Sequence, residues 1–368
     1  MSKSSEFKPT PEQQKIIDNE GNTIVIANPG TGKTTTLSFK IISLLENNVI
    51  PEDILCITYT EKAKKEMYDA IKKNSQGKIA DSIISRVNIN TFHSFAYQHL
   101  LESGDISGEI IGNNILRFSI LQSFLKHDIF NYGKDYLIDD IVPKVENAIR
   151  YIKNFGITPD IIDISKAKSH AAKLHDESSS SYSTDEILTF IEKFVDVYRD
   201  YENSKNNAID YVDMLLQFSK NYSGRKFPYV AVDEMQDMNE IEAQIVEMVS
   251  ENLFLVGDAK QAIFGFQGGS IKNFQKFEQS CKPMLLSTNR RSTQQILGYS
   301  KKYFLDRTEH RAKFEKHLEN FNSSDTGSIP KIFSTAAPLK KVLSLINENP
   351  GKEIGIITRT NAQIIEIS

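Results

Sequence analysis

The stretch ANPGTGKTTT, residues 27–36, decides the fold class because its glycine-rich loop joins two segments of different character. Before it, NTIVIAN (22–28) is a short apolar run rich in β-branched residues, which indicates a buried strand of a parallel sheet. After it, residues 34–48 carry apolar side chains at helical spacing. A strand, a glycine loop and a helix in this order predict a phosphate-binding loop.

In such a loop, backbone N–H groups at the helix N-terminus face the phosphates, Lys33 neutralises them and Thr34 ligates Mg²⁺. Ala27 stands where the strict pattern G-x-x-x-x-G-K-[ST] has its first glycine. The alternative, a glycine turn before a surface helix, is disfavoured by the flanking strand and helix patterns. The candidate nucleotide-binding residues of the loop are Asn28, Pro29, Gly30, Thr31, Gly32, Lys33, Thr34 and Thr35.

A second strand-like run, YVAV (229–232), is followed at once by Asp233 and Glu234. Carboxylates at this edge of a parallel sheet lie where such folds bind their ligands. We therefore expect Asp233 to hold Mg²⁺ and Glu234 to act as general base toward the attacking water. A solvated acidic loop is the alternative interpretation.

A third strand-like run, LFLVGD (253–258), precedes Gln261, whose amide could sense a γ-phosphate. Phe264 and Phe266 follow in a glycine-rich segment. They suit either core packing or stacking on unstacked bases.

The segment FKPTPEQQKIID (7–18) predicts a helix with Thr10 as N-cap, Pro11 at the first position and Gln13 completing a capping box. The Gln13 amide could also hydrogen-bond adenine, and the two roles are compatible.

Composition bounds the function classes. The chain has 368 residues, 39% hydrophobic and 25% charged, which is typical of a globular protein with two or three folding units. No apolar run is long enough to span a bilayer, and the first residues lack a secretory pattern, so we expect a cytoplasmic protein. Cys56 and Cys281 offer neither a disulfide framework nor a metal quartet. A net charge of −4 argues mildly against nucleic acid, without excluding a local basic groove.

Taken together, these segments resemble a superfamily 1 DNA helicase of the UvrD/Rep/PcrA type. TPEQQ (10–14) is similar to the Q motif, ANPGTGKT (27–34) to motif I and VDEMQD (232–237) to motif II. The remaining matches follow in family order: ILCITYTEKAKKEM (54–67) to motif Ia, NTFHSFA (90–96) to motif Ib, AIDYVDMLLQF (208–218) to the segment before motif II, VGDAKQAIFGFQGG (256–269) to motif III, LSTNRRSTQQI (286–296) to motif IV and IGIITRTNAQ (354–363) to the first strand-turn motif of the second motor domain.

The resemblance implies ATP and Mg²⁺ as ligands and single-stranded DNA, or a duplex with a single-stranded tail, as partner. It implies that Lys33, Glu234, Gln261 and Arg291 serve catalysis, that Thr34 and Asp233 hold the metal, and that Arg290 and Arg291 approach the nucleotide from across a cleft. The DNA-binding residues that it implies are Tyr59, Thr60, His93, Ser94, Phe264, Phe266, Arg359 and Asn361. From the residues alone, Tyr59 and His93 would equally fit a packed core.

Three residues depart from the family pattern. Asn28 replaces a common glycine, Arg290 replaces the tyrosine that stacks on adenine, and Gln267 replaces an arginine. An arginine plane can still stack on a base, but the base preference is put in doubt.

The expected architecture is an α/β fold: a RecA-like P-loop motor domain with a parallel sheet, an inserted helical subdomain and the first half of a second RecA-like domain. The expected boundaries are 1–104 and 206–285 for the first motor domain, 105–205 for the helical subdomain and 286–368 for the partial second domain. A helical stripe runs from 187 to 201, with a capping box at Ser183 and Glu186 and a polar loop, 176–186, around its start. In the last part we expect a helix over 293–305, strands over 331–335 and 353–358, and a helix over 339–349.

The family continues with motifs V and VI, whose sequence is not present. This predicts that residues 1–368 are a portion of a longer protein, with a naturally short relative as the alternative. Residues 1–368 alone are expected to hydrolyse ATP slowly and to unwind no duplex. Two functions stay open: an ATP-hydrolysing single-strand translocase of 3′-to-5′ polarity, or a nucleotide-dependent DNA- or protein-binding adaptor with an incomplete motor. A P-loop kinase fits less well, since it needs neither VDEMQD nor TFHSFA.

Overall fold

The computed structural model describes residues 8–106, 109–127, 133–176, 184–261, 271–308 and 311–358. Residues 177–183 of the expected polar loop, which include Ser183, lie outside them, as do Phe264, Phe266, Arg359 and Asn361, so the expectations placed there stay predictions.

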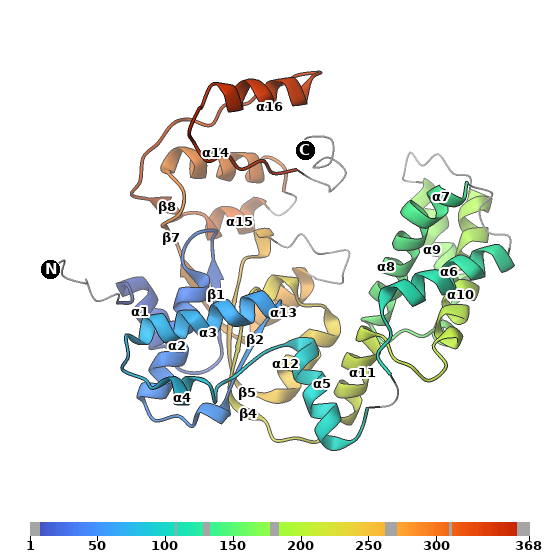
Figure 1. Ribbon diagram of the computed structural model, residues 1–368, viewed down its shortest axis with the longest axis horizontal. Helices are drawn as coiled ribbons and strands as arrows, with labels where there is room; N and C mark the ends of the chain where they lie inside the picture. The colour runs from blue at the N-terminus through green and yellow to red at the C-terminus, as the bar shows by residue number, and fades with distance from the viewer. Residues whose placement is uncertain are drawn as a thin grey trace.

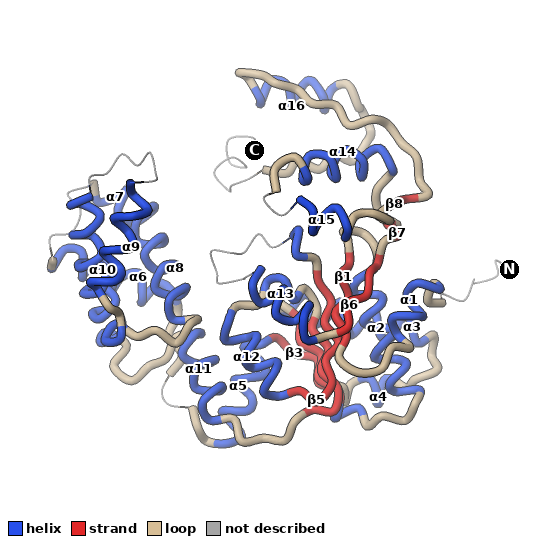
Figure 2. Tube along the Cα trace, turned by 180° about the vertical axis from the view of Figure 1, so that it is seen from behind, coloured by secondary structure: helices blue, strands red, loops and turns tan. Residues whose placement is uncertain are grey.

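Six parallel strands form the central sheet, in the order β3-β2-β4-β5-β1-β6. Figure 2 shows the sheet with helices on both sides of it. Because all six are parallel, their carboxyl ends meet at one edge, where ligands of open α/β sheets bind. The strands are β1 (Thr23–Ala27), β2 (Ile54–Thr58), β3 (Asn88–Thr91), β4 (Phe227–Val232), β5 (Ser250–Gly257) and β6 (Lys282–Leu286).

The strands expected around NTIVIAN, YVAV and LFLVGD are confirmed as β1, β4 and β5. Sequence reasoning missed β6, which opens with Lys282 and Pro283 and pairs only with β1 in the described sheet. A proline is compatible with such an edge strand because one side of its backbone needs no ladder partner.

Alternate side chains of the strands enter two separate cores, as expected for a sheet covered on both faces. Ile24 and Ile26 pack in one core, whereas Val25 and Ala27 pack in the other. The first core is covered by α5 (Phe92–Ser103), α11 (Tyr211–Asn221), α12 (Glu240–Val249) and α13 (Ile271–Ser280). The second is covered by α1 (Pro11–Ile17), α2 (Lys33–Glu46), α3 (Glu61–Ser75) and α4 (Asp81–Ile84) (Figure 1).

A helical subdomain stands beside the sheet, with a core of its own (Figure 1). Buried Val197, Tyr198 and Tyr201 from the expected helical stripe contribute to that core. Its helices are α6 (Asn113–Lys126), α7 (Lys134–Tyr136), α8 (Val142–Lys153), α9 (Ile164–Asp176) and α10 (Thr184–Ser204). Short helical turns lie between these elements up to β6: η1 (Pro51–Asp53), η2 (Leu137–Ile141), η3 (Pro159–Ile161), η4 (Met235–Asp237) and η5 (Ala259–Gln261).

The part after β6 carries a small parallel pair, β7 (Thr288–Asn289) with β8 (Asn322–Ser323). Its helices are α14 (Gln294–Leu305), α15 (Arg311–His317) and α16 (Pro338–Asn347), so the two helices expected here are confirmed.

The strands expected over 331–335 and 353–358 are wrong, because neither segment is a strand in the structure. A strand needs a hydrogen-bonded neighbour, and these two segments pair with no described strand. Their apolar side chains are instead exposed, among them Ile332 and Ile357.

Within the described ranges, no helix combines the length and apolar character needed to cross a bilayer.

Candidate nucleotide and nucleic-acid site

The loop between β1 and α2 has the backbone geometry of an anion site. Gly30 and Gly32 both have positive φ, 71° and 89°, which glycine adopts without steric cost. The N-cap of α2 is Gly32, so no side chain caps the first N–H groups of this 14-residue helix, and its first turn carries no acidic residue. These N–H groups and the helix dipole therefore favour a phosphate.

The loop is also braced internally. The Thr31 hydroxyl donates to the Asn28 carbonyl at 2.7 Å, and Thr35 is half-buried in the first turn of α2. The side chain of Asn28 is fully buried and its Nδ2 donates to the carbonyls of Leu286, 3.4 Å away, and His317, 3.2 Å away. This residue, which departs from the family glycine, ties the base of the loop to the end of β6 and to the end of α15.

Two side chains of the loop meet the acidic pair that follows β4. The Lys33 ammonium is ion-paired with the Glu234 carboxylate, and the Thr34 hydroxyl lies 3.3 Å from Asp233 Oδ2. Glu234 has a left-handed backbone, φ 50°, at the sharp turn that starts η4. The structure therefore brings together four residues that the sequence predicted for one site.

Thr34 and Asp233 offer the oxygen ligands that Mg²⁺ prefers, a hydroxyl and a carboxylate. Burial, and next the charge of Glu234, raise the pKa of Asp233 to about 6 against the opposing charge of Lys33. A carboxylate held in this way is a suitable partner for a cation. Burial disfavours its charged form, and the positive charge of the cation compensates for that cost. The donor set fits a magnesium ion bound with a nucleotide.

Sequence reasoning missed Gln236 as part of the site. Its Nε2 donates to Glu234 Oε2 at 2.8 Å, and its Oε1 accepts from the backbone N–H of Asp258 at 2.9 Å. Gln236 thereby joins the general-base candidate to the end of β5. A Cβ on Gly257 would lie 2.6 Å from Gln236 Oε1, so this close approach requires glycine. The signal was visible in VDEMQD, where an amide follows two acids.

Gln261 ends η5, and its Nε2 donates to Asp258 Oδ2 at 3.0 Å. Its hydrogen bonds in the structure go to Asp258, so its contact with a γ-phosphate stays a prediction. Gln13 forms the expected capping box with Thr10, which is confirmed. Its Nε2 also donates to Thr36 Oγ1 on α2 at 3.0 Å, so adenine recognition by this amide stays a prediction.

The segment after β6 reaches the loop from the other side. The Arg290 N–H donates to the Gly30 carbonyl at 2.9 Å, and Arg291 is exposed beside it. Asn289 was not among the predicted site residues, although it is buried and its Nδ2 donates to the Pro29 carbonyl at 2.5 Å. The signal was its place in the motif NRRS, where it directly precedes the two arginines.

The residues predicted for DNA follow adjacent strands. Tyr59 and Thr60 come directly after β2, and His93 and Ser94 lie in the first turn of α5 after β3. Because β2 and β3 are paired and parallel, these residues lie at the same edge of the sheet.

Their side chains have structural partners as well. Thr60 caps α3, and Ser94 completes the capping box of Thr91. Tyr59 is half-buried. The His93 ring packs edge-on against Tyr211, with ring centroids 5.5 Å apart. Burial, helped by the charge of Arg150, lowers the pKa of His93 to about 4, so its imidazole is neutral near pH 7.

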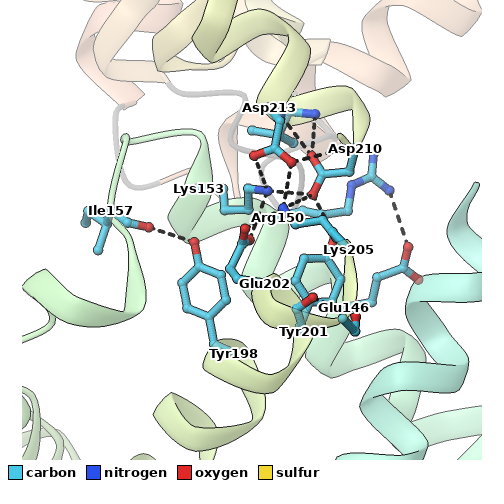
Figure 3. A network of polar contacts seen from close by, with 12 residues as sticks. Glu146, Arg150, Lys153, Ile157, Tyr198, Tyr201, Glu202, Lys205, Asp210 and Asp213 are labelled. Carbon is cyan, nitrogen blue, oxygen red and sulfur yellow. Dashed lines mark hydrogen bonds and ion pairs between the residues drawn. The ribbon is translucent and has the colours of Figure 1, made fainter. Parts of the chain in front are cut away.

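A buried ionic network joins the helical subdomain to α11 (Figure 3). Lys153, at the end of α8, contacts Glu202 at 3.0 Å, Asp210 at 2.5 Å and Asp213 at 2.7 Å. Lys205 contacts Asp213 at 2.6 Å and is also paired with Glu202. The three carboxylates lie close enough to suggest a metal site, but the two buried lysines already pair with all three of them.

Asp210 holds several elements of this network at once. It caps α11 through the N–H groups of Val212 and Asp213 and accepts from the Tyr201 hydroxyl at 2.8 Å. Burial alone would raise the pKa of Asp210, but the charges of Lys153 and Lys205 outweigh it and lower that pKa. The network therefore fixes the orientation of the helical subdomain on the segment that carries Tyr211.

Comparison with known proteins agrees with this geometry. The family model described as the UvrD/REP helicase N-terminal domain matches residues 9–282. The chain belongs to the UvrD/Rep helicase family. The match covers the loop, the acidic pair and the helical subdomain that lies between them in sequence, and it ends within β6.

Relatives in the same family are DNA helicases by name. The chain is 29% identical over 307 residues to an ATP-dependent DNA helicase PcrA of Leuconostoc citreum, covering 78% of this chain and 37% of that protein. It is 29% identical over 364 residues to a probable DNA helicase II homolog of Mycoplasma capricolum, covering 92% of this chain and 47% of that protein. An ATP-dependent DNA helicase PcrA of Staphylococcus aureus is 27% identical over 327 residues. The chain thus spans less than half the length of these relatives.

Proposed function

We propose that this UvrD/Rep-family chain binds Mg²⁺-ATP between its phosphate loop and its acidic pair, and couples ATP hydrolysis to movement along single-stranded DNA in the 3′-to-5′ direction. The observation that supports the nucleotide site best is the convergence of Lys33 and Thr34 with Glu234 and Asp233 at the carboxyl edge of the sheet. The names of the relatives support the DNA part of the proposal.

In this proposal, the N–H groups at the start of α2 and the Lys33 ammonium bind the phosphates. Lys33 is paired with Glu234 in the structure, so binding of phosphate transfers the ammonium from one anion to another. Glu234 is then free to accept a proton from the attacking water. Thr34 and Asp233 hold the metal ion, which neutralises phosphate charge when it is bound.

The segment after β6 would complete the site. Arg291 is proposed to contact the γ-phosphate and Arg290 to lie along the base, since their backbone is already held against Gly30. A cation in this position stabilises the charge that develops in phosphoryl transfer. Gln261 is proposed to report the γ-phosphate to the segment that carries Phe264 and Phe266.

The DNA track is proposed to run over the residues after β2 and β3, with Tyr59 stacking on a base and the first turn of α5 contacting the backbone. Stacking of this kind is sequence-tolerant. Arg359 and Asn361 would extend the track.

We further propose the division into a first motor domain (1–104 and 206–285), a helical subdomain (105–205) and part of a second motor domain (286–368). The separate core of α6–α10 supports the second unit. A cytoplasmic location fits the two cysteines, which are both buried free thiols.

The test is ATP hydrolysis with and without single-stranded DNA, measured for the chain and for Glu234→Gln. Hydrolysis that DNA stimulates and that Glu234→Gln abolishes supports a motor. Nucleotide binding that changes DNA affinity without any turnover supports the adaptor instead.

A further inference from the structure

Asn289 occupies a special position between the phosphate loop and the arginine segment. It is the last residue of β7, where it pairs with Ser323 of β8, and its side chain is only 2% exposed. Its amide group is used at both ends. Nδ2 donates to the Pro29 carbonyl of the loop, while Oδ1 accepts from the N–H groups of Arg291 at 2.8 Å and Ser292 at 2.6 Å.

The loop itself shows how close this approach is. A Cβ built on Gly30 would lie 2.6 Å from Asn289 Nδ2 and 2.8 Å from Arg291 Cβ. Glycine at position 30 is therefore required by the arginine segment as well as by its own positive φ. The Arg290 N–H adds a direct hydrogen bond to the Gly30 carbonyl.

We propose that Asn289 is a positioning residue that sets Arg291 against the phosphate loop, so that any contact of Arg291 with a γ-phosphate depends on the Asn289 amide. The Oδ1 contacts fix the turn from which the Arg291 side chain leaves, and the Nδ2 contact fixes the distance of that turn from the loop. This inference rests on the proposed role of Arg291. The selectivity for a nucleoside triphosphate over a diphosphate would then depend on the buried Asn289 amide, which acts through Arg291 and does not itself contact the nucleotide.

The experiment compares the dissociation constants of ADP and ATPγS, both with Mg²⁺, by competition against a fluorescent ATP analogue. The dissociation constant of ADP divided by that of ATPγS measures the γ-phosphate contact, and this ratio can be determined without turnover. Arg291→Ala should lower this ratio about tenfold or more, because a charge-assisted contact is lost. Asn289→Ala should lower it about tenfold, with ADP affinity nearly unchanged.

The double variant Asn289→Ala/Arg291→Ala decides whether the two residues act as one unit. If Asn289 acts through Arg291, the double variant has the ratio of Arg291→Ala alone. Independent, multiplying losses would overturn the inference. Asn273→Ala is the matched control, since Asn273 is equally buried and donates to the Met238 carbonyl far from the loop in sequence. It should leave the ratio unchanged.

Asn289→Asp covers the case in which the alanine variant does not fold. Aspartate keeps an acceptor for the Arg291 and Ser292 N–H groups but cannot donate to the Pro29 carbonyl. Its ratio should fall below the wild-type value, and a wild-type ratio would contradict the inference. If Arg291→Ala itself leaves the ratio unchanged, the proposed role of Arg291 fails and the inference falls with it. If only the Asn289 variants leave it unchanged, the inference fails alone.

Discussion

The Lys33 ammonium is ion-paired with the Glu234 carboxylate, although 201 positions separate the two residues in the chain. The lysine starts α2, which follows β1, and the glutamate lies just after β4. In the sheet, β5 lies between β1 and β4, so the ion pair reaches past one strand. Each residue is the charged partner of the other in the structure. A nucleotide that binds Lys33 therefore also releases the proposed general base.

Glu234→Gln should bind Mg²⁺-ATP at least as tightly as the wild type and should not turn it over. The amide keeps the shape of the side chain but no longer competes with phosphate for Lys33 and no longer accepts a proton. Loss of a general base typically costs about 10²- to 10⁴-fold in rate. Steady-state hydrolysis with single-stranded DNA, together with nucleotide titration, measures both parts.

Glu240→Gln is the control for that variant, because Glu240 is a glutamate at the start of the nearby helix α12 without a place in the site. It should hydrolyse ATP at the wild-type rate. Wild-type hydrolysis by Glu234→Gln in a protein that turns over ATP would mean that another base is at work.

Tyr59→Ala should weaken the binding of single-stranded DNA by about tenfold, with little dependence on base sequence, since stacking contributes roughly 1–3 kcal/mol per base. Affinity should also fall steeply with salt, because backbone contacts release counterions. Fluorescence anisotropy with homopolymeric oligonucleotides gives both dependences.

Tyr68→Ala separates stacking from packing. Tyr68 is a half-buried tyrosine on α3 that packs against the core between the sheet and α1–α4. It should lose stability without losing DNA affinity. Equal losses of stability and no specific loss of binding in Tyr59→Ala would favour a core role for Tyr59.

His93 should make the protein less stable as the pH falls. Its pKa is about 4 in the folded chain and near 6.5 when unfolded, so between these values the unfolded state binds the proton that the folded state rejects. Its contribution is fully present above the unfolded pKa. Lowering the pH from about 7 to about 5 should remove roughly 2 kcal/mol from the free energy of unfolding through this group.

The carboxyl group of Glu242 works in the opposite direction, since burial raises its pKa to about 7. The informative quantity is therefore the difference between the wild type and His93→Gln in urea unfolding at the two pH values. On going from about pH 7 to about pH 5, the change in the free energy of unfolding should be more favourable for His93→Gln than for the wild type by the amount above. Parallel curves for the two proteins would show that His93 is protonated as easily in the folded chain as in the unfolded one.

Lys153→Ala should lower the free energy of unfolding by about 3–5 kcal/mol, because it leaves buried carboxylates without one of their two cations. The nearby Lys205 would keep its own contacts to Asp213 and Glu202. Lys166→Ala, which breaks an exposed pair between Lys166 on α9 and the preceding Asp163, should change stability by no more than about 0.5 kcal/mol. A similar small effect of both substitutions would show that the network does not hold the subdomain junction.

The strong local patterns of the sequence predicted which residues the structure brings together at the candidate site, while their binding of a nucleotide stays a prediction. An apolar run followed by a glycine-rich loop predicted the strand and the loop before Lys33. The two acids after residues 229–232 predicted a second strand that ends at the same edge of the sheet. What they could not show is that Lys33 and Glu234 are paired, since this depends on the order of strands in the sheet.

Other features depend on contacts between distant segments and leave a weak local signal. The strand β6 begins with a lysine and a proline, and its pairing with β1 gives the sheet its sixth strand. Asn289 and Gln236 were visible as residues of a motif, but their positions follow from hydrogen bonds to distant segments, among them those to Pro29 and Asp258. For the segments 331–335 and 353–358 the local signal was present but the prediction was wrong. Their composition favours strands, yet no described strand pairs with them.

The most direct test of the account is a titration of the chain with a fluorescent ATP analogue and Mg²⁺, compared with Lys33→Ala. Lys40→Ala serves as the control, because Lys40 lies on the same helix and donates to the carbonyls of Ile17 and Asn19. The account predicts saturable binding by the wild type and Lys40→Ala, and a loss of affinity of about 100-fold or more in a folded Lys33→Ala, since a charge-assisted phosphate contact disappears. Unchanged affinity in a folded Lys33→Ala protein would contradict the assignment of residues 28–35 as the phosphate-binding loop.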